Sequence, residues 1–186
     1  MWMKEVLAAV FDKAVWFLKL YVEQYKGLLL FIAAFVLLYV FFMHWINVRF
    51  LNRLRQPAAL ISLAVELLAI ASFTLLFREA GTQRRYELEL FWSYRTWIFG
   101  KSVALGMEIL NNILLFFPLG FVITDALKRC SFAGVLFLSG FISCLVEFSQ
   151  YYFRLGLFEF DDIFNNVLGA LAGWCVFHML KGSRSR

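Results

Sequence analysis

Residues 102–124 (SVALGMEILNNILLFFPLGFVIT) and 131–153 (SFAGVLFLSGFISCLVEFSQYYF) determine the fold class of this chain. Each stretch is predominantly apolar and contains one charged side chain, Glu108 in the first and Glu147 in the second. A helix of about 20 such residues is long enough to cross the hydrocarbon core of a bilayer. The two stretches therefore predict two transmembrane helices joined by a short loop.

Further apolar runs of similar length occur on both sides of this pair, at 27–45, 57–77 and 163–180. Apolar residues make up 62% of the 186 residues, compared with about 45–50% in soluble domains. A chain of this size could not bury that much apolar surface in one aqueous core. We expect an all-α, polytopic bundle of about five spans, with residues 27–77 forming two N-terminal spans and residues 87–180 forming a core of three.

The first 26 residues have a different pattern. On a helical wheel their seven charged side chains occupy one half, and apolar side chains such as Val10 and Phe17 occupy the other. This pattern is typical of an amphipathic helix that lies in the membrane interface. A sixth, poorly apolar span is the alternative for residues 1–26.

Basic residues predict the orientation of the bundle. They follow the first, third and fifth predicted spans, at Arg49, Arg53, Arg55, Lys128, Arg129, Lys181, Arg184 and Arg186. Loops rich in Lys and Arg favour the cytoplasmic side, so we expect a multi-pass protein of the bacterial cytoplasmic membrane with these loops inside. The connection 78–101 also carries five basic residues on the opposite side, which weighs against that assignment.

The charge and the metal-binding residue types exclude several kinds of partner. The net charge of +5 lies in loops that flank membrane spans, which favours contact with membrane lipids and not with nucleic acid. Neither the three cysteines nor the two histidines have the spacing of a zinc site or a disulfide framework. We therefore expect no metal and no cofactor, and the oligomeric state stays open.

Three carboxyl side chains lie inside the predicted spans, at Glu66, Glu108 and Glu147, with no basic residue in any span. A charge at the centre of a bilayer costs at least about 2.5–3.5 kcal/mol. Such residues therefore face the interior of the bundle or a wet cavity. Pro118 within 102–124 predicts a kink, and Gly169 and Gly173 predict a close helix–helix approach.

Most of the polar residues in the last three spans share one depth. At about 1.5 Å per residue, they fall within roughly 15 Å of the same membrane face, whichever way the bundle is oriented. The candidate ligand-binding residues at this level are Glu108, Asn112, Glu147, Gln150, Arg154, Asp161, Asp162 and Asn166. Helical spacing of three or four residues places a carboxylate beside an amide on each of three helices. The pattern favours a polar pocket, and hydrogen bonds that only hold the helices together are the alternative.

Three segments resemble the VanZ family of bacterial membrane proteins. They are NNILLFFPLGF (111–121), VEFSQ (146–150), and Arg154 followed by FDDIFNNVLGALAG (160–173). The order and approximate spacing of the three are similar to the family pattern over residues 87–177. The resemblance implies a protein associated with low-level resistance to the glycopeptide teicoplanin.

Three functions are compatible with this pattern. The favoured one is binding of a lipid-linked cell-wall precursor or a lipidated glycopeptide at the outer leaflet. The second is an intramembrane enzyme acting on a lipid or lipid-linked precursor, with Glu147 as general base, Asp162 as its partner and Asn112 as a hydrogen-bond donor. The third is a small lipid flippase or transporter.

Overall fold

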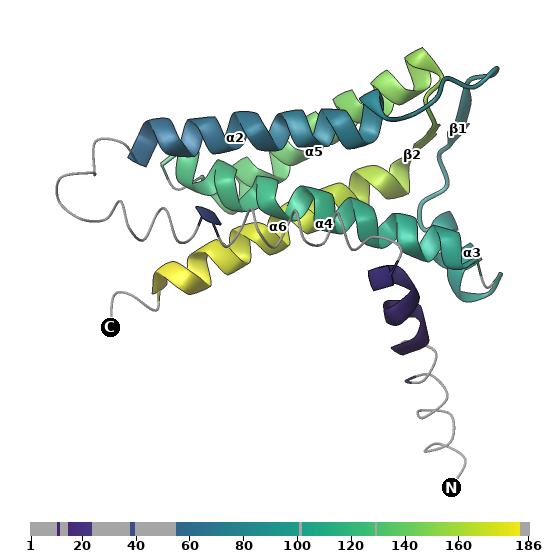
Figure 1. The fold of residues 1–186 in the computed structure, drawn as a ribbon, viewed down its shortest axis with the longest axis horizontal. Helices are drawn as coiled ribbons and strands as arrows, with labels where there is room; N and C mark the ends of the chain where they lie inside the picture. Colours follow the sequence, from purple (N-terminus) through teal and green to yellow (C-terminus); the bar gives the residue numbers. More distant parts are fainter. Residues whose placement is uncertain are drawn as a thin grey trace, which may run out of the picture.

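A computed structural model describes residues 11, 15–23, 38–39, 55–100, 102–128 and 130–182. In chain order its elements are α2 (Arg55–Ala71), the π-helix η2 (Ser72–Leu76), β1 (Arg85–Glu87), α3 (Trp92–Ile98), α4 (Val103–Ala126), α5 (Phe132–Phe153), β2 (Leu157–Glu159) and α6 (Phe160–Gly182). The long helices α2, α4, α5 and α6 form the body of the bundle (Figure 1).

Four helices in the described ranges are long and apolar enough to cross a membrane: Gln56–Leu76, Val103–Ala126, Phe132–Phe153 and Phe160–Leu180. They match the predicted spans 57–77, 102–124, 131–153 and 163–180, so the prediction of an all-α membrane bundle is confirmed. The predicted first span, 27–45, lies outside the described residues except for Leu38 and Tyr39.

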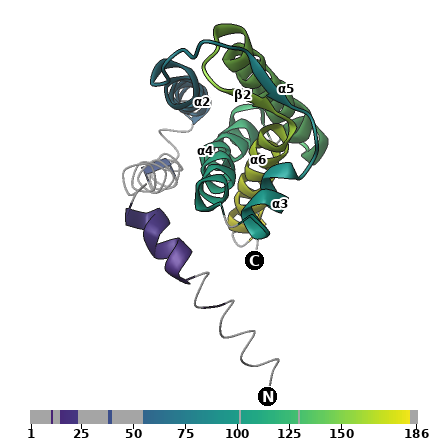
Figure 2. The same cartoon turned by 90° about the vertical axis from the view of Figure 1, so that its right-hand side faces the viewer.

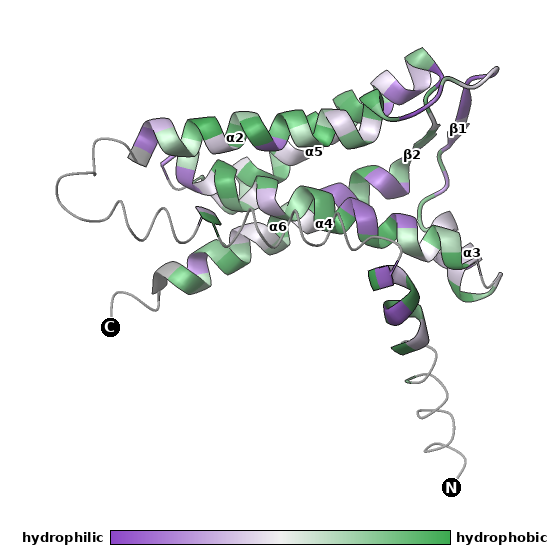
Figure 3. Cartoon of the chain, viewed as in Figure 1, coloured by the Kyte–Doolittle hydropathy of each residue, from purple (hydrophilic) through white to green (hydrophobic). Residues whose placement is uncertain are grey.

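Helix α4 is the most enclosed of the four and pairs closely with α6. Both helices begin at the end of the bundle that carries α3, β1 and β2, so they run parallel (Figure 1). Figure 2 looks onto that end and shows α2 and α5 lying over the α4–α6 pair, and α3 beside the beginning of α6. We call this end of the molecule the polar end, because hydrophilic residues gather there (Figure 3).

Glycine residues allow the close approach of α4 and α6. A Cβ atom built on Gly169 would overlap the carbonyl oxygen of Ile113, and one built on Gly173 would overlap that of Phe117. On α4, a Cβ atom on Gly120 would overlap the carbonyl oxygen of Ala170. The predicted close approach at Gly169 and Gly173 is confirmed, and it brings two backbones together as small residues do in other membrane helix pairs.

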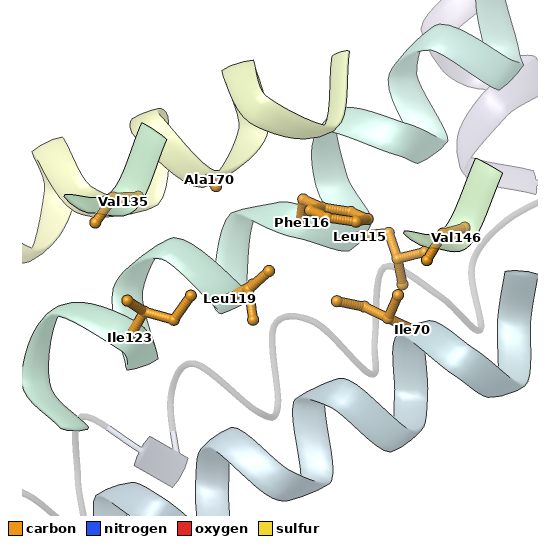
Figure 4. Close-up of a cluster of buried hydrophobic side chains, with 8 residues drawn as sticks. All are labelled: Ile70, Leu115, Phe116, Leu119, Ile123, Val135, Val146 and Ala170. Carbon is orange, nitrogen blue, oxygen red and sulfur yellow. The ribbon is translucent and has the colours of Figure 1, made fainter. Parts of the chain in front are cut away.

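The apolar core lies between α4 and its three long neighbours (Figure 4). It contains side chains from all four helices, namely Ile70, Leu115, Phe116, Leu119, Ile123, Val135, Val146 and Ala170. Helix α4 continues through Pro118 from Val103 to Ala126, so the proline does not break the span.

The polar end carries a small folded cap that the sequence did not predict. Strand β1 pairs with β2 in parallel, with Tyr86 opposite Phe158 and Glu87 opposite Glu159. The backbone amide of Gly81 donates to the carbonyl oxygen of Arg154 at 2.7 Å. The connection 78–101 is thus tied to the segment between α5 and α6.

Residues 15–23 are helical, and the rest of the predicted interfacial helix 1–26 lies outside the described residues except for Phe11. Tyr21 is buried, and its hydroxyl donates to Asn111 Oδ1 of α4 at 2.6 Å. The Phe17 ring lies 5.6 Å from the Trp97 ring of α3. These contacts dock residues 15–23 against the polar end.

Candidate functional site

Four carboxyl groups meet at the polar end, and we call them the carboxyl cluster: Glu108, Glu147, Glu159 and Asp162. They come from α4, α5, β2 and α6, in that order. The charge of Glu108 acts on each of the other three, and the charge of Glu147 acts on Asp162. Three members of the cluster are at most 6% exposed, and Glu108 is half-buried. The fold therefore brings together three residues predicted to share one depth.

Glu147 and Glu159 are held in place by hydrogen bonds. Glu147 Oε2 accepts from the backbone amide of Glu159 at 3.1 Å, which ties the last two turns of α5 to β2. Glu159 Oε2 in turn accepts from the indole nitrogen of Trp92 on α3 at 3.1 Å. Burial, together with the charge of Glu108, raises the pKa of Glu159 to about 7, although the Trp92 hydrogen bond lowers it. Glu159 is therefore partly protonated near neutral pH.

Among the described residues, Arg78 is a basic side chain whose position brings it close to the carboxyl cluster. It follows η2, and its charge acts on both Glu147 and Asp162. A Cβ atom built on Gly156 would lie 2.7 Å from Arg78 Nη1 and 3.4 Å from Gln150 Oε1, so the guanidinium lies over Gly156 and beside the Gln150 amide. In the part of the chain that the structure describes, the ion pair present is Arg95 with Glu89 at 2.7 Å, and Arg78 forms none.

Amide side chains line the deeper part of the site. Asn166 Nδ2 donates to Ser143 Oγ at 2.9 Å, and Gln150 Nε2 donates to the carbonyl oxygen of Thr74 at 3.2 Å. Within the described residues, Asn166 Oδ1, Gln150 Oε1 and Asn112 Nδ2 are buried without a hydrogen-bond partner. Buried polar atoms without partners are rare in native proteins, so these three atoms mark the place as a candidate for function.

Asp161 has a different role from its neighbour Asp162. Its carboxylate accepts from the backbone amides of Phe91 and Ser93 at 2.5 and 2.9 Å, and from Ser93 Oγ at 2.5 Å. It therefore holds the beginning of α3. One turn along α6, Asn165 Oδ1 accepts from the hydroxyl of Tyr94. Burial and the charge of Asp161 raise the pKa of Tyr94, so its hydroxyl remains a donor at neutral pH.

Arg154 is exposed and ends α5 in a left-handed conformation, with φ of 63°. Its backbone carbonyl holds Gly81, and no ion pair with Glu159 or Asp161 is present among the described residues. Arg78 takes the place near the carboxyl cluster where the sequence predicted Arg154.

The start of the last helix also differs from the prediction. Helix α6 begins at Phe160 and not at Ile163, so Asp161 and Asp162 lie in its first turn, where carboxylates are stabilised by the helix dipole.

Glu66 lies apart from the carboxyl cluster. It is 1% exposed on the buried face of α2 that also carries Leu63 and Ile70, both packed in the apolar core. Neither of its oxygens has a hydrogen-bond partner among the described residues. Within the described residues, no group of three or more His, Cys, Asp or Glu side chains is arranged to hold a metal ion.

The sequence pattern does not identify Arg78 or Glu159 as site residues. Both lie outside the apolar runs, in the connections between predicted spans. The only sign of either residue in the sequence is a charge next to the end of a span, and ordinary exposed loops carry the same sign. Glu159 is placed in the site by the pairing of β1 with β2 and by its hydrogen bonds with Glu147 and Trp92.

When the chain is compared with known proteins, one family model matches it. The family model described as VanZ/LLP1 matches residues 63–181, which is more than half of the chain. No curated protein and no solved structure matches.

Proposed function

The chain belongs to the VanZ/LLP1 family, and from this premise we propose that it binds a lipidated or lipid-linked ligand at the outer leaflet and so contributes to resistance to glycopeptides such as teicoplanin. The protein is a multi-pass membrane protein, and the proposal places it in the bacterial cytoplasmic membrane. The observation that carries the proposal is the carboxyl cluster, which lies at the ends of α4, α5 and α6 beside buried amide atoms that find no partner in the described part of the chain. At this depth a lipid headgroup or the polar part of a lipidated molecule meets the protein while its acyl chain remains in the bilayer.

The orientation of the polar end is part of the proposal and has its own test. Gln83 is exposed in the cap, and Lys128 is exposed after α4 at the opposite end. In a background with Cys130, Cys144 and Cys175 replaced by alanine, a membrane-impermeant maleimide should label Gln83→Cys in intact cells. It should label Lys128→Cys only after permeabilisation, because basic loops favour the cytoplasm. The reverse pattern would place the polar end at the inner leaflet.

The two adjacent aspartates allow a direct test of the binding role. Asp162→Asn should remove the resistance phenotype while the protein accumulates normally, because losing a charge in the first turn of a helix costs only about 0.3–1 kcal/mol. Asp161→Asn is the matched variant, and it should reduce protein abundance, since hydrogen bonds to a charged acceptor contribute about 1.5–3 kcal/mol each. The measurements are the minimal inhibitory concentration of teicoplanin and the amount of protein in the membrane. Full resistance of Asp162→Asn cells at normal abundance would remove Asp162 from the site.

An intramembrane enzyme is the second candidate, because the carboxyls of Glu147 and Asp162 lie close enough for their charges to interact. Pairs of carboxyl groups in different environments divide acid and base roles in several enzyme classes. In this reading Glu147 accepts a proton from a substrate hydroxyl or water, and Asn112 donates to the developing oxyanion.

A further inference from the structure

The carboxyl cluster places acidic side chains from four elements near the guanidinium of Arg78. The charge of Arg78 acts on Glu147 and Asp162, and its guanidinium lies over Gly156 without forming an ion pair among the described residues. Groups of this kind require compensation when they are withdrawn from water. Two deeply buried side chains, Gln150 and Asn166 (2% exposed each), also present oxygen atoms that accept no hydrogen bond from the described residues. The site therefore offers groups of both kinds to a partner, a guanidinium for an anion and carboxyl and amide oxygens for a cation.

A ligand of a single charge would satisfy only part of this arrangement. An anionic group could pair with Arg78, whose planar guanidinium matches phosphate oxygens, but Glu147 and Asp162 would repel it. A cationic group could pair with the carboxyl cluster, but it would leave Arg78 without a partner. A ligand that carries an anion and a primary ammonium a few bonds apart satisfies both, since an ammonium offers three hydrogen-bond donors to carboxylate and amide oxygens.

The depth of the site indicates where such a ligand comes from. Arg78 lies two residues after the end of η2, Glu147 lies in the last two turns of α5, and Asp162 lies in the first turn of α6. All three are at the ends of membrane-spanning segments, which is the level of phospholipid headgroups. A lipid in the surrounding leaflet can therefore present its headgroup to the site without leaving the bilayer.

We propose that the site binds the headgroup of an aminophospholipid, with the phosphate on Arg78 and the primary ammonium among Glu108, Glu147 and Asp162. This inference rests on the proposed binding function and specifies its ligand class. The buried oxygens of Gln150 and Asn166 accept the remaining donors of the ammonium or of its water. Charge complementarity of this kind determines which headgroup is selected.

The test measures lipid binding to the purified full-length protein in nonionic detergent by native mass spectrometry. The probes are short-chain phosphatidylethanolamine, phosphatidylglycerol, which lacks the ammonium, and phosphatidylcholine, whose ammonium has no hydrogen to donate. Soluble phosphoethanolamine is included to separate a membrane lipid from a free phosphate ester. The wild-type protein should bind phosphatidylethanolamine at least about tenfold more tightly than the other three, a difference of about 1.4 kcal/mol.

Three variants isolate Arg78. Arg78→Gln removes its charge, and Gly156→Ala displaces its guanidinium without changing any charge, because the new methyl group would lie 2.7 Å from Nη1. The displaced atom is the end of a flexible side chain, so Gly156→Ala should still fold. Arg84→Gln is the matched control: it removes the same charge from an arginine of the same connection that lies over the rings of Tyr151 and Tyr152. The first two variants should lose the preference for phosphatidylethanolamine, and Arg84→Gln should keep it.

Several outcomes would overturn the inference. Equal binding of phosphatidylglycerol would show that the ammonium is not recognised, and equal binding of phosphoethanolamine would show that the source is not a lipid. Unchanged selectivity in both Arg78→Gln and Gly156→Ala would remove Arg78 from the site. If the wild-type protein binds no phosphatidylethanolamine but Asp162→Asn still abolishes resistance, the ligand class is wrong and the binding function stands. If Asp162→Asn retains resistance at normal abundance, the binding function itself is wrong.

Discussion

Replacing Gly169 by alanine is expected to prevent the chain from accumulating as a folded protein. The added methyl group would overlap the carbonyl oxygen of Ile113, which belongs to the backbone of α4 and cannot rotate away. Helices α4 and α6 would have to separate along their whole contact. Overpacking usually costs about 1–3 kcal/mol, and a backbone clash lies at or above the upper end of that range. A loss of about 3 kcal/mol lowers the folded-to-unfolded ratio by more than about a hundredfold.

Gly140→Ala is the control for this prediction. Gly140 lies within α5, and a Cβ atom there would lie 3.7 Å from Val167 Cγ2, which is ordinary van der Waals contact. Alanine is favoured over glycine in a helix interior by about 0.8–1.0 kcal/mol, so this variant should be as stable as the wild type or more stable. The measurements are yield in the membrane and the thermal unfolding midpoint in detergent. Equal yields of Gly169→Ala and Gly140→Ala would contradict the close packing of α4 against α6.

The second large effect is expected at Glu147. Substitution by glutamine should weaken ligand binding only, whereas substitution by leucine should also lower the amount of folded protein. Glutamine retains an acceptor for the backbone amide of Glu159, so Glu147→Gln should accumulate normally. It lacks the negative charge that the carboxyl cluster offers to an ammonium, and it cannot exchange a proton. Ligand binding should therefore weaken by about tenfold to a hundredfold, because a hydrogen bond to a charged group contributes about 1.5–3 kcal/mol.

Glu147→Leu should abolish the function and should also lower the abundance of the protein in the membrane. Leucine leaves the buried amide of Glu159 without its acceptor, which costs about 1–3 kcal/mol, and it releases β2 from α5. Binding and resistance are measured beside protein abundance for both variants. Full function of Glu147→Gln at normal abundance would show that only hydrogen bonding matters at this position. Normal binding by Glu147→Gln with complete loss of resistance would favour the enzyme reading, since a general base is required after binding and not for it.

The positions of the four membrane spans that the structure describes followed from the sequence alone. A run of about 20 apolar residues must satisfy its backbone within one segment when it is surrounded by lipid, so local composition is sufficient to place it. The predicted span 131–153 and the observed helix Phe132–Phe153 differ by one residue. The shared depth of Glu108 and Glu147 followed from the same local counting, and so did the close approach permitted by Gly169 and Gly173.

The tertiary structure decided which polar residues share a site. Asp161 and Asp162 are adjacent and chemically identical, and successive residues of a helix point about 100° apart. The docking of α3 against one side of α6 assigns Asp161 to the backbone of Phe91 and Ser93 and leaves Asp162 to the carboxyl cluster. No local pattern contains that information, because the contact joins segments about 70 residues apart in the chain.

Arg78 and Glu159 also could not be assigned to the site from the sequence. Arg78 follows one span and Glu159 precedes another, and both lie in charged segments that hydropathy alone assigns to loops. Their places depend on the parallel pairing of β1 with β2 and on the hydrogen bond between Gly81 and Arg154. Pairing between distant strands is non-local and is not encoded in the periodicity of either segment. The sequence by itself therefore determined the bundle and the depth of its polar residues, and the packing of the cap determined which cation and which carboxyl groups meet there.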